Sequence, residues 1–174
     1  MKPLLFKIIL LCELCFFLCS CGRDNDKISP GDIAKDFRLD TLAHKRFYLN
    51  QHKGKVIVLV FWTTWCNICK AELSELKSLK YMPSNENLVI AGICSDPENI
   101  NDAKQIAKNL KIDYPVLLDK SQIVTLEYMI SSFPTTVIIN QEGVVSFIRE
   151  GYNAAIMNQV KSKVVGLFAS DEDV

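Results

Sequence analysis

A C-x-x-C pair placed directly after a strongly apolar run constrains this chain more than any other feature. The run Val56–Trp62 lacks polar alternation, as is typical of a parallel strand buried on both faces. Cys66 and Cys69 follow it, where the periodicity changes to that of a helix. Backbone N–H groups at a helix start favour negative charge, so Cys66 can ionise near neutral pH, with Cys69 one turn away. The pattern predicts a reversible dithiol–disulfide centre.

Other roles for this cysteine pair fit the sequence less well. A structural zinc ion needs four ligands, but there is no second C-x-x-C, and His44 and His52 lack the H-x₃₋₅-H spacing. A purely structural bridge across so short a loop removes little entropy from the unfolded chain. Inert buried thiols are a third alternative, against which the flanking tryptophans and the helix start argue. We therefore expect neither a metal nor a cofactor.

The N-terminal twenty residues have the features of a bacterial signal peptide. Lys2 and Lys7 flank the start of an apolar stretch that is shorter than the roughly 20 residues of a membrane span. The stretch ends in Leu18–Cys21, which resembles a lipobox with Cys21 as the residue that receives lipid. Plain secretion or an uncleaved helical anchor is the alternative. In each case we expect the domain outside the cytoplasm.

Composition divides the chain into four parts. Residues 1–20 are the predicted lipoprotein-type signal, 21–30 a polar tether, 31–170 one folded domain and 171–174 an acidic tail. The formal net charge is zero and no basic stripe is visible, so we do not expect nucleic-acid binding. Beyond Cys21 only Cys66, Cys69 and Cys94 remain, too few for a disulfide scaffold. Cys94, at the end of a predicted strand, is interpreted as a small buried hydrophobe rather than a third redox thiol.

Strands and helices alternate along the folded part of the chain. Predicted strands cover residues 36–39, 46–49, 56–62, 88–93, 116–118, 137–139 and 144–149. Predicted helices cover 67–81, 96–110 with Asp96 as N-cap, 121–129 and 154–168. This order predicts an α/β fold with a mixed sheet.

The stretch Phe61–Lys70 resembles the active-site segment of thioredoxin-fold proteins. The wider pattern is similar to that of the TlpA/ResA-type membrane-anchored thiol–disulfide oxidoreductases of the AhpC/TSA–redoxin superfamily. Tyr114–Asp119 and Phe133–Thr136 agree with it in order and spacing, and the resemblance covers about residues 28–168. It implies a thioredoxin-like fold, in which helices flank a central mixed β-sheet, with an N-terminal β-hairpin and a βα insertion.

The resemblance also implies roles for individual residues. Pro134 matches a proline that the family holds in cis beside the dithiol, and the preceding Phe133 offers backbone hydrogen bonds to an incoming chain. Glu72 matches a glutamate that can accept the proton of Cys69, the alternative being a solvated helix residue. Five residues that flank the dithiol and the proline are predicted to contact substrate: Trp65, Asn67, Ile68, Phe133 and Thr135.

The function implied is that of an extracytoplasmic enzyme, in the periplasm or on the outer face of the cell membrane. It would reduce disulfides of exported proteins, as in cytochrome c maturation or envelope redox control, and a membrane thiol reductant would reset it. We expect a monomer. Asn67-Ile68 separates the cysteines, Val60 stands where thioredoxin has a buried aspartate, and Ser74 replaces a frequent proline. Because no histidine lies between the cysteines, a reductant is favoured over a strong oxidant.

Two rival functions remain open at the level of sequence. Thr63–Cys66 contains the T-x-x-C of a peroxiredoxin-like peroxidase that would use Cys66, although Leu59 stands where that family has a proline. The second rival function is non-catalytic: a domain that binds unfolded chains, or a copper carrier that uses the two thiols.

Overall fold

The computed structural model describes residues 27–82, 85–96 and 100–169. The predicted signal peptide, Cys21 and the acidic tail lie outside these residues, so their assignments stay predictions. Within the described ranges, no helix is both long enough and apolar enough to cross a bilayer.

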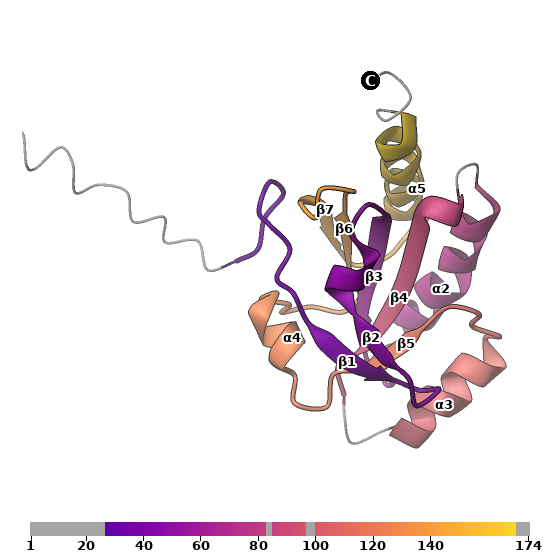
Figure 1. Cartoon of the computed structure of the whole chain (residues 1–174). Helices are drawn as coiled ribbons and strands as arrows, with labels where there is room; N and C mark the ends of the chain where they lie inside the picture. Colours follow the sequence, from indigo (N-terminus) through magenta and orange to yellow (C-terminus); the bar gives the residue numbers. More distant parts are fainter. Residues whose placement is uncertain (1–26, 83–84, 97–99, 170–174) are drawn as a thin grey trace, which may run out of the picture.

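One seven-stranded mixed sheet, in the order β2-β1-β5-β4-β3-β6-β7, forms the centre of the fold (Figure 1). The strands are β1 (Arg38–Thr41), β2 (Arg46–Tyr48), β3 (Val56–Trp62), β4 (Leu88–Cys94), β5 (Val116–Leu118), β6 (Thr135–Ile139) and β7 (Val145–Glu150). The helices are α2 (Asn67–Leu76), α3 (Ile100–Asn109), α4 (Ile123–Glu127) and α5 (Ala154–Ala169), with 3₁₀ turns η1 (Leu49–His52), η2 (Lys77–Tyr81) and η3 (Asn85–Asn87). The predicted thioredoxin-like α/β fold is confirmed.

Strand β3 is central, which explains its unbroken apolar sequence. It pairs in parallel with β4, from Val56 opposite Leu88 to Trp62 opposite Cys94. On its other side it pairs antiparallel with β6. All seven residues of β3 are buried because helices or chain segments cover both faces of the sheet.

The two faces of the sheet carry separate hydrophobic cores. Alternate β3 residues, among them Val60 and Trp62, pack with α2, α3 and α5, while Leu59 and Phe61 face α4 and the N-terminal segment. The predicted hairpin is β1–β2, and β1 also pairs with β5. The predicted insertion is α3, which connects β4 to β5. Both additions therefore lie at the β5 side of the sheet, away from β6 and β7.

One helix prediction needs correction. The helix expected over 67–81 is α-helical only to Leu76 and then tightens into the 3₁₀ turn η2, a common way to end a helix. The helix cap predicted at Asp96 involves residues 97–99, which lie outside the described residues, so it stays a prediction. The described part of that helix begins at Ile100. The Asp96 carboxylate accepts hydrogen bonds from Thr64, on the loop that leads to Cys66.

Gly92 is required by the packing of β4 beneath α2. A Cβ atom at this position would lie 3.2 Å from Nε1 of Trp62 and 3.3 Å from Cδ2 of Leu73, so these buried side chains would have to shift by a few tenths of an ångström. We expect Gly92→Ala to destabilise the fold by about 1–3 kcal/mol in urea unfolding. Gly166→Ala on α5 is the matched control, because a Cβ there meets nothing within 4 Å. It should stabilise by about 0.5–1 kcal/mol, and equal losses in both variants would contradict this packing argument.

Candidate active site

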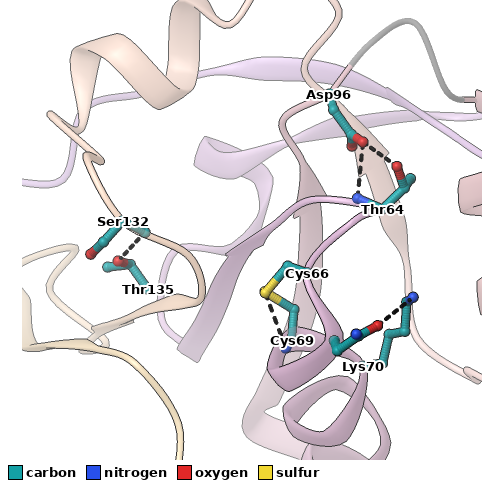
Figure 2. The surroundings of a disulfide bond; sticks show 8 residues. Thr64, Cys66, Cys69, Lys70, Asp96, Ser132 and Thr135 are labelled. Carbon is teal, nitrogen blue, oxygen red and sulfur yellow. Dashed lines mark hydrogen bonds between the residues drawn. A yellow bond between two sulfur atoms is a disulfide. The ribbon is translucent and has the colours of Figure 1, made fainter.

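The dithiol lies where β3 gives way to α2. Cys66 is the N-cap of α2 and keeps an extended backbone, with φ −83° and ψ 103°. Its Sγ accepts a hydrogen bond from the backbone N–H of Cys69 at 3.2 Å, and the two cysteines form a disulfide with their Cα atoms 5.3 Å apart (Figure 2). A thiolate at Cys66 would receive the same N–H bond and the favourable end of the helix dipole. The predicted redox pair is therefore joined, at the predicted helix start.

The two sulfurs differ in access. Cys66 is 6% exposed, whereas Cys69 is fully buried. An incoming disulfide can therefore reach Cys66 first. The buried Cys69 can then attack the mixed disulfide formed at Cys66. This difference in access favours Cys66 as the attacking sulfur and Cys69 as the resolving one.

A loop with a cis peptide bond borders the dithiol. The bond between Phe133 and Pro134 is cis, as the family resemblance implied. The loop continues into β6, whose first residue pairs with Phe61 of β3, so the loop lies beside the end of β3. The Thr135 hydroxyl donates to the Ser132 carbonyl at 2.8 Å and is buried (Figure 2). That side chain holds the loop together, and the predicted contact of Thr135 with substrate stays a prediction.

Apolar side chains surround the accessible sulfur. Trp65 is 69% exposed and Ile68 51% exposed, which is unusual for residues of this kind. The Trp65 ring lies edge-on to that of Phe133, with centroids 6.2 Å apart. Asn67 accepts a hydrogen bond from Lys70 at the exposed side of the helix start. Four of the five predicted substrate contacts thus lie together around Cys66.

Glu72 is buried, so the alternative of a solvated helix residue is wrong. Its side chain is fully covered, one turn after Cys69 on α2. The pKa of its carboxyl is raised to about 7, chiefly by burial; a hydrogen bond from Thr136 opposes this rise and the charge of Glu75 adds to it. A carboxyl with this pKa is divided between its protonated and ionised forms near neutral pH. It can therefore accept and return a proton.

Thr136 is the residue that sequence reasoning missed. Its hydroxyl donates to Oε1 of Glu72 at 2.6 Å, while Oε2 is buried without a hydrogen-bond partner. One carboxylate oxygen is thus fixed and the other is left for the proton. The pairing of β3 with β6 explains this contact. Thr136 lies opposite Val60, so its side chain faces the same core as α2.

Cys94 behaves as a small buried residue. It is the free cysteine of the described residues, is 2% exposed, and donates its S–H to Oδ1 of Asp96 at 3.0 Å. Burial, followed by the bond to Asp96, raises the pKa of the Cys94 thiol, so the thiol stays protonated. In the part of the chain that the structure describes, no three His, Cys, Asp or Glu side chains converge to hold a metal ion.

A dithiol at a helix start, beside a cis-proline loop and within a mixed sheet flanked by helices, defines a thioredoxin-fold thiol–disulfide oxidoreductase. Comparison with known proteins agrees. The AhpC/TSA family model matches residues 30–148, and the chain belongs to that family. Within it, the chain is a thiol–disulfide oxidoreductase of the ResA type.

Two curated relatives and one solved structure illustrate the similarity. The chain is 32% identical over 125 residues to the thioredoxin-like protein YneN of Bacillus subtilis, covering 71% of this chain and 73% of YneN. It is 30% identical over 141 residues to the thiol-disulfide oxidoreductase ResA of the same organism, covering 78% of this chain and 76% of ResA. The exposed lipoprotein thioredoxin Etrx1 of Streptococcus pneumoniae superposes with a TM-score of 0.63 at 27% identity, covering 74% of this chain and 99% of Etrx1.

Proposed function

We propose that this protein reduces disulfides in exported client proteins outside the cytoplasm. The observation that carries the proposal is the placement of a joined Cys66–Cys69 pair beside a buried carboxyl, Glu72, whose pKa is about 7. A helix start stabilises the attacking thiolate, and the carboxyl serves the thiol that completes the reaction. The similarity to the thiol-disulfide oxidoreductase ResA supports chemistry of this class.

The reaction begins with the pair in its dithiol state. The Cys66 thiolate attacks one sulfur of a client disulfide; a new S–S bond forms, the client bond breaks, and one client thiolate leaves and takes a proton from water. Cys69 then gives its proton to Glu72 and attacks Cys66 Sγ. The second client thiolate leaves and is protonated. Two electrons have passed to the client, and a disulfide joins Cys66 to Cys69.

Client binding is proposed for the apolar surface around the accessible sulfur. Trp65 and Ile68 lie on the helix side, and Phe133 lies on the side of the cis-proline loop. A backbone offered beside Pro134 can pair with an extended client segment in the manner of an added strand, as the family resemblance implies. Because these contacts are apolar or made by backbone, they suit clients of varied sequence.

Regeneration requires an external electron source. We propose that a membrane thiol reductant returns the Cys66–Cys69 disulfide to the dithiol by the same exchange in reverse. A tether on the membrane surface would keep the domain near that donor. Residues 1–20 as signal, Cys21 as lipid site and 21–30 as tether fit this arrangement.

Cys21→Ala should release the protein from the membrane. In cells supplied with radiolabelled palmitate, we expect label on the native chain and none on the variant, with the variant moving to the soluble envelope fraction. Cys19→Ala is the matched control and should remain labelled. Equal labelling of the native chain and of Cys21→Ala would contradict the assignment of the lipid site.

The direction of electron flow is tested by mixing the purified dithiol form with insulin in the absence of any other reductant. We expect one insulin disulfide to be reduced for each Cys66–Cys69 disulfide formed. Mass spectrometry of alkylated samples measures both. The reverse mixture, disulfide-form protein with reduced insulin, should react far less completely. The opposite result would reverse the proposed function.

A further inference from the structure

Asp96 joins two segments at the sheet edge that carries the dithiol. One oxygen, Oδ2, accepts from the backbone N–H of Thr64 at 2.9 Å and also from the Thr64 hydroxyl (Figure 2). The other oxygen, Oδ1, accepts the S–H of Cys94 at 3.0 Å. This carboxylate therefore receives three hydrogen bonds, two from the loop that follows β3 and one from the last residue of β4.

The carboxylate is itself held in place. Ser95, the residue before Asp96, donates its N–H to the Trp62 carbonyl at 2.9 Å, and its own carbonyl accepts from the Gln122 side chain at 2.9 Å. Its hydroxyl is hydrogen-bonded to the Thr125 hydroxyl at 2.8 Å. Asp96 thus follows a residue tied to β3 and α4. It offers a fixed acceptor rather than a mobile surface charge.

The segment that Asp96 holds is the one that delivers Cys66. Thr64 is buried and lies two residues before Cys66, and the Cys66 N–H donates to the Thr63 carbonyl at 3.2 Å. The position of this loop determines whether Cys66 Sγ meets the N–H of Cys69, which a thiolate needs. Without an acceptor, the buried Thr64 N–H would favour a shift of the loop toward water.

We propose that Asp96 is a positioning residue for the dithiol, acting through Thr64 to keep Cys66 at the N-terminus of α2. The inference rests on the proposed thiol–disulfide function. It adds to that machinery a residue on the segment that follows β4, whereas the dithiol follows β3. Asp96 touches neither sulfur of the redox pair by any hydrogen bond in the described residues. Its effect is therefore on the reactivity of Cys66 through loop geometry.

The effect of the Asp96 charge must be separated from the effect of loop position, because the two change the pKa of Cys66 in opposite directions. Removing a carboxylate near Cys66 would by itself lower the pKa of the thiol, whereas releasing the loop would raise it. Asp96→Asn and Asp96→Ala remove the same charge, but the asparagine carbonyl can still accept the Thr64 N–H. The difference between these two variants therefore measures positioning alone.

The experiment uses the reduced full chain in detergent and measures the rate of iodoacetamide alkylation at Cys66 against pH. Below the pKa of Cys66 we expect Asp96→Ala to react about tenfold more slowly than Asp96→Asn. This is the effect expected when the Cys66 thiolate loses its one hydrogen bond from the N–H of Cys69. Asp96→Asn should equal or exceed the native chain. Asp102→Ala, at an exposed aspartate of α3, is the matched control and should leave the profile unchanged.

The outcomes separate this inference from the proposed function. Equal profiles for the two Asp96 variants, measured on chains that both show cooperative unfolding, would overturn the positioning role. If Asp96→Ala fails to fold, Thr64→Pro, which lacks the N–H, replaces it, and a profile like that of the native chain overturns the role equally. The proposed function fails independently if the native dithiol does not reduce insulin.

Discussion

Cys69→Ser should accumulate covalent adducts between Cys66 and client proteins, whereas Cys66→Ser should accumulate none. Without the resolving thiol, the mixed disulfide formed by Cys66 has no partner to release it. Turnover with a model disulfide should fall about a thousandfold or more in either variant, because both steps are required. Non-reducing gels of envelope fractions, followed by mass spectrometry, would show the adducts and their release by dithiothreitol.

The controls for this trapping experiment distinguish the rival functions. The double variant, with both cysteines changed to serine, should form no covalent adduct with a client and reduce no disulfide, whereas a non-catalytic carrier would keep its full function. Cys94→Ser should behave as the native chain, since that thiol is buried and bonded to Asp96. Equal trapping by Cys66→Ser and Cys69→Ser would contradict the assigned roles. Faster oxidation of Cys66 by peroxide than by a disulfide would favour a peroxidase.

Glu72→Gln should slow the resolving step by about a hundredfold at neutral pH, the usual size of a general-base contribution. In the native chain this step should accelerate as pH rises and level off above about 7, where the Glu72 carboxyl is ionised and can accept the proton of Cys69. The variant should lose that inflection. The step can be followed by stopped-flow fluorescence after the dithiol-form protein is mixed with a disulfide substrate, because Trp65 lies directly beside Cys66.

Two neighbouring substitutions should move the inflection in opposite directions. Thr136→Val removes a hydrogen bond that lowers the pKa of Glu72, so the inflection should shift to higher pH. Glu75→Gln removes a charge that raises this pKa, so the inflection should shift slightly to lower pH without loss of rate. Shifts in the same direction would contradict the assignment of the inflection to Glu72.

The same carboxyl predicts a pH dependence of stability. Its pKa rises from 4.5 to about 7 on folding, chiefly through burial, so between these values the folded chain binds more protons than the unfolded chain. Stability therefore falls as pH rises through that window. Glu72→Gln should remove this loss and exceed the native chain above pH 7 by on the order of 2–3 kcal/mol in urea unfolding. A stability difference that is constant from pH 4.5 to 7 would show that Glu72 does not titrate there.

The sequence allowed prediction of the parts of the site that depend on local pattern. An apolar run followed by C-x-x-C places the dithiol at a helix start because strand and helix periodicities are local signals. Pro134 and the dithiol could be related only through resemblance to a family, since they are far apart in the chain. The cis bond confirms that relation.

Other parts of the site depend on packing between elements, and local pattern alone does not predict them. By its pattern Glu72 resembles any charged helix residue, and only the family resemblance marked it as a proton acceptor; it is fully buried against Thr136 of β6. The spacing that marks Asp96 as a helix cap gives no sign that its carboxylate accepts from Thr64. Both contacts join segments that are brought together by the strand order, in which β3 lies between β4 and β6.

A redox titration of Cys66 and Cys69 against glutathione tests the central claim most directly. Alkylation and mass spectrometry at each ratio of reduced to oxidised glutathione report how much of the pair is joined. We predict a single two-electron transition with a midpoint well below that of the glutathione couple, as expected of a reductant. A pair that never joins in any oxidising buffer, or a midpoint near that of strong oxidases, would contradict it.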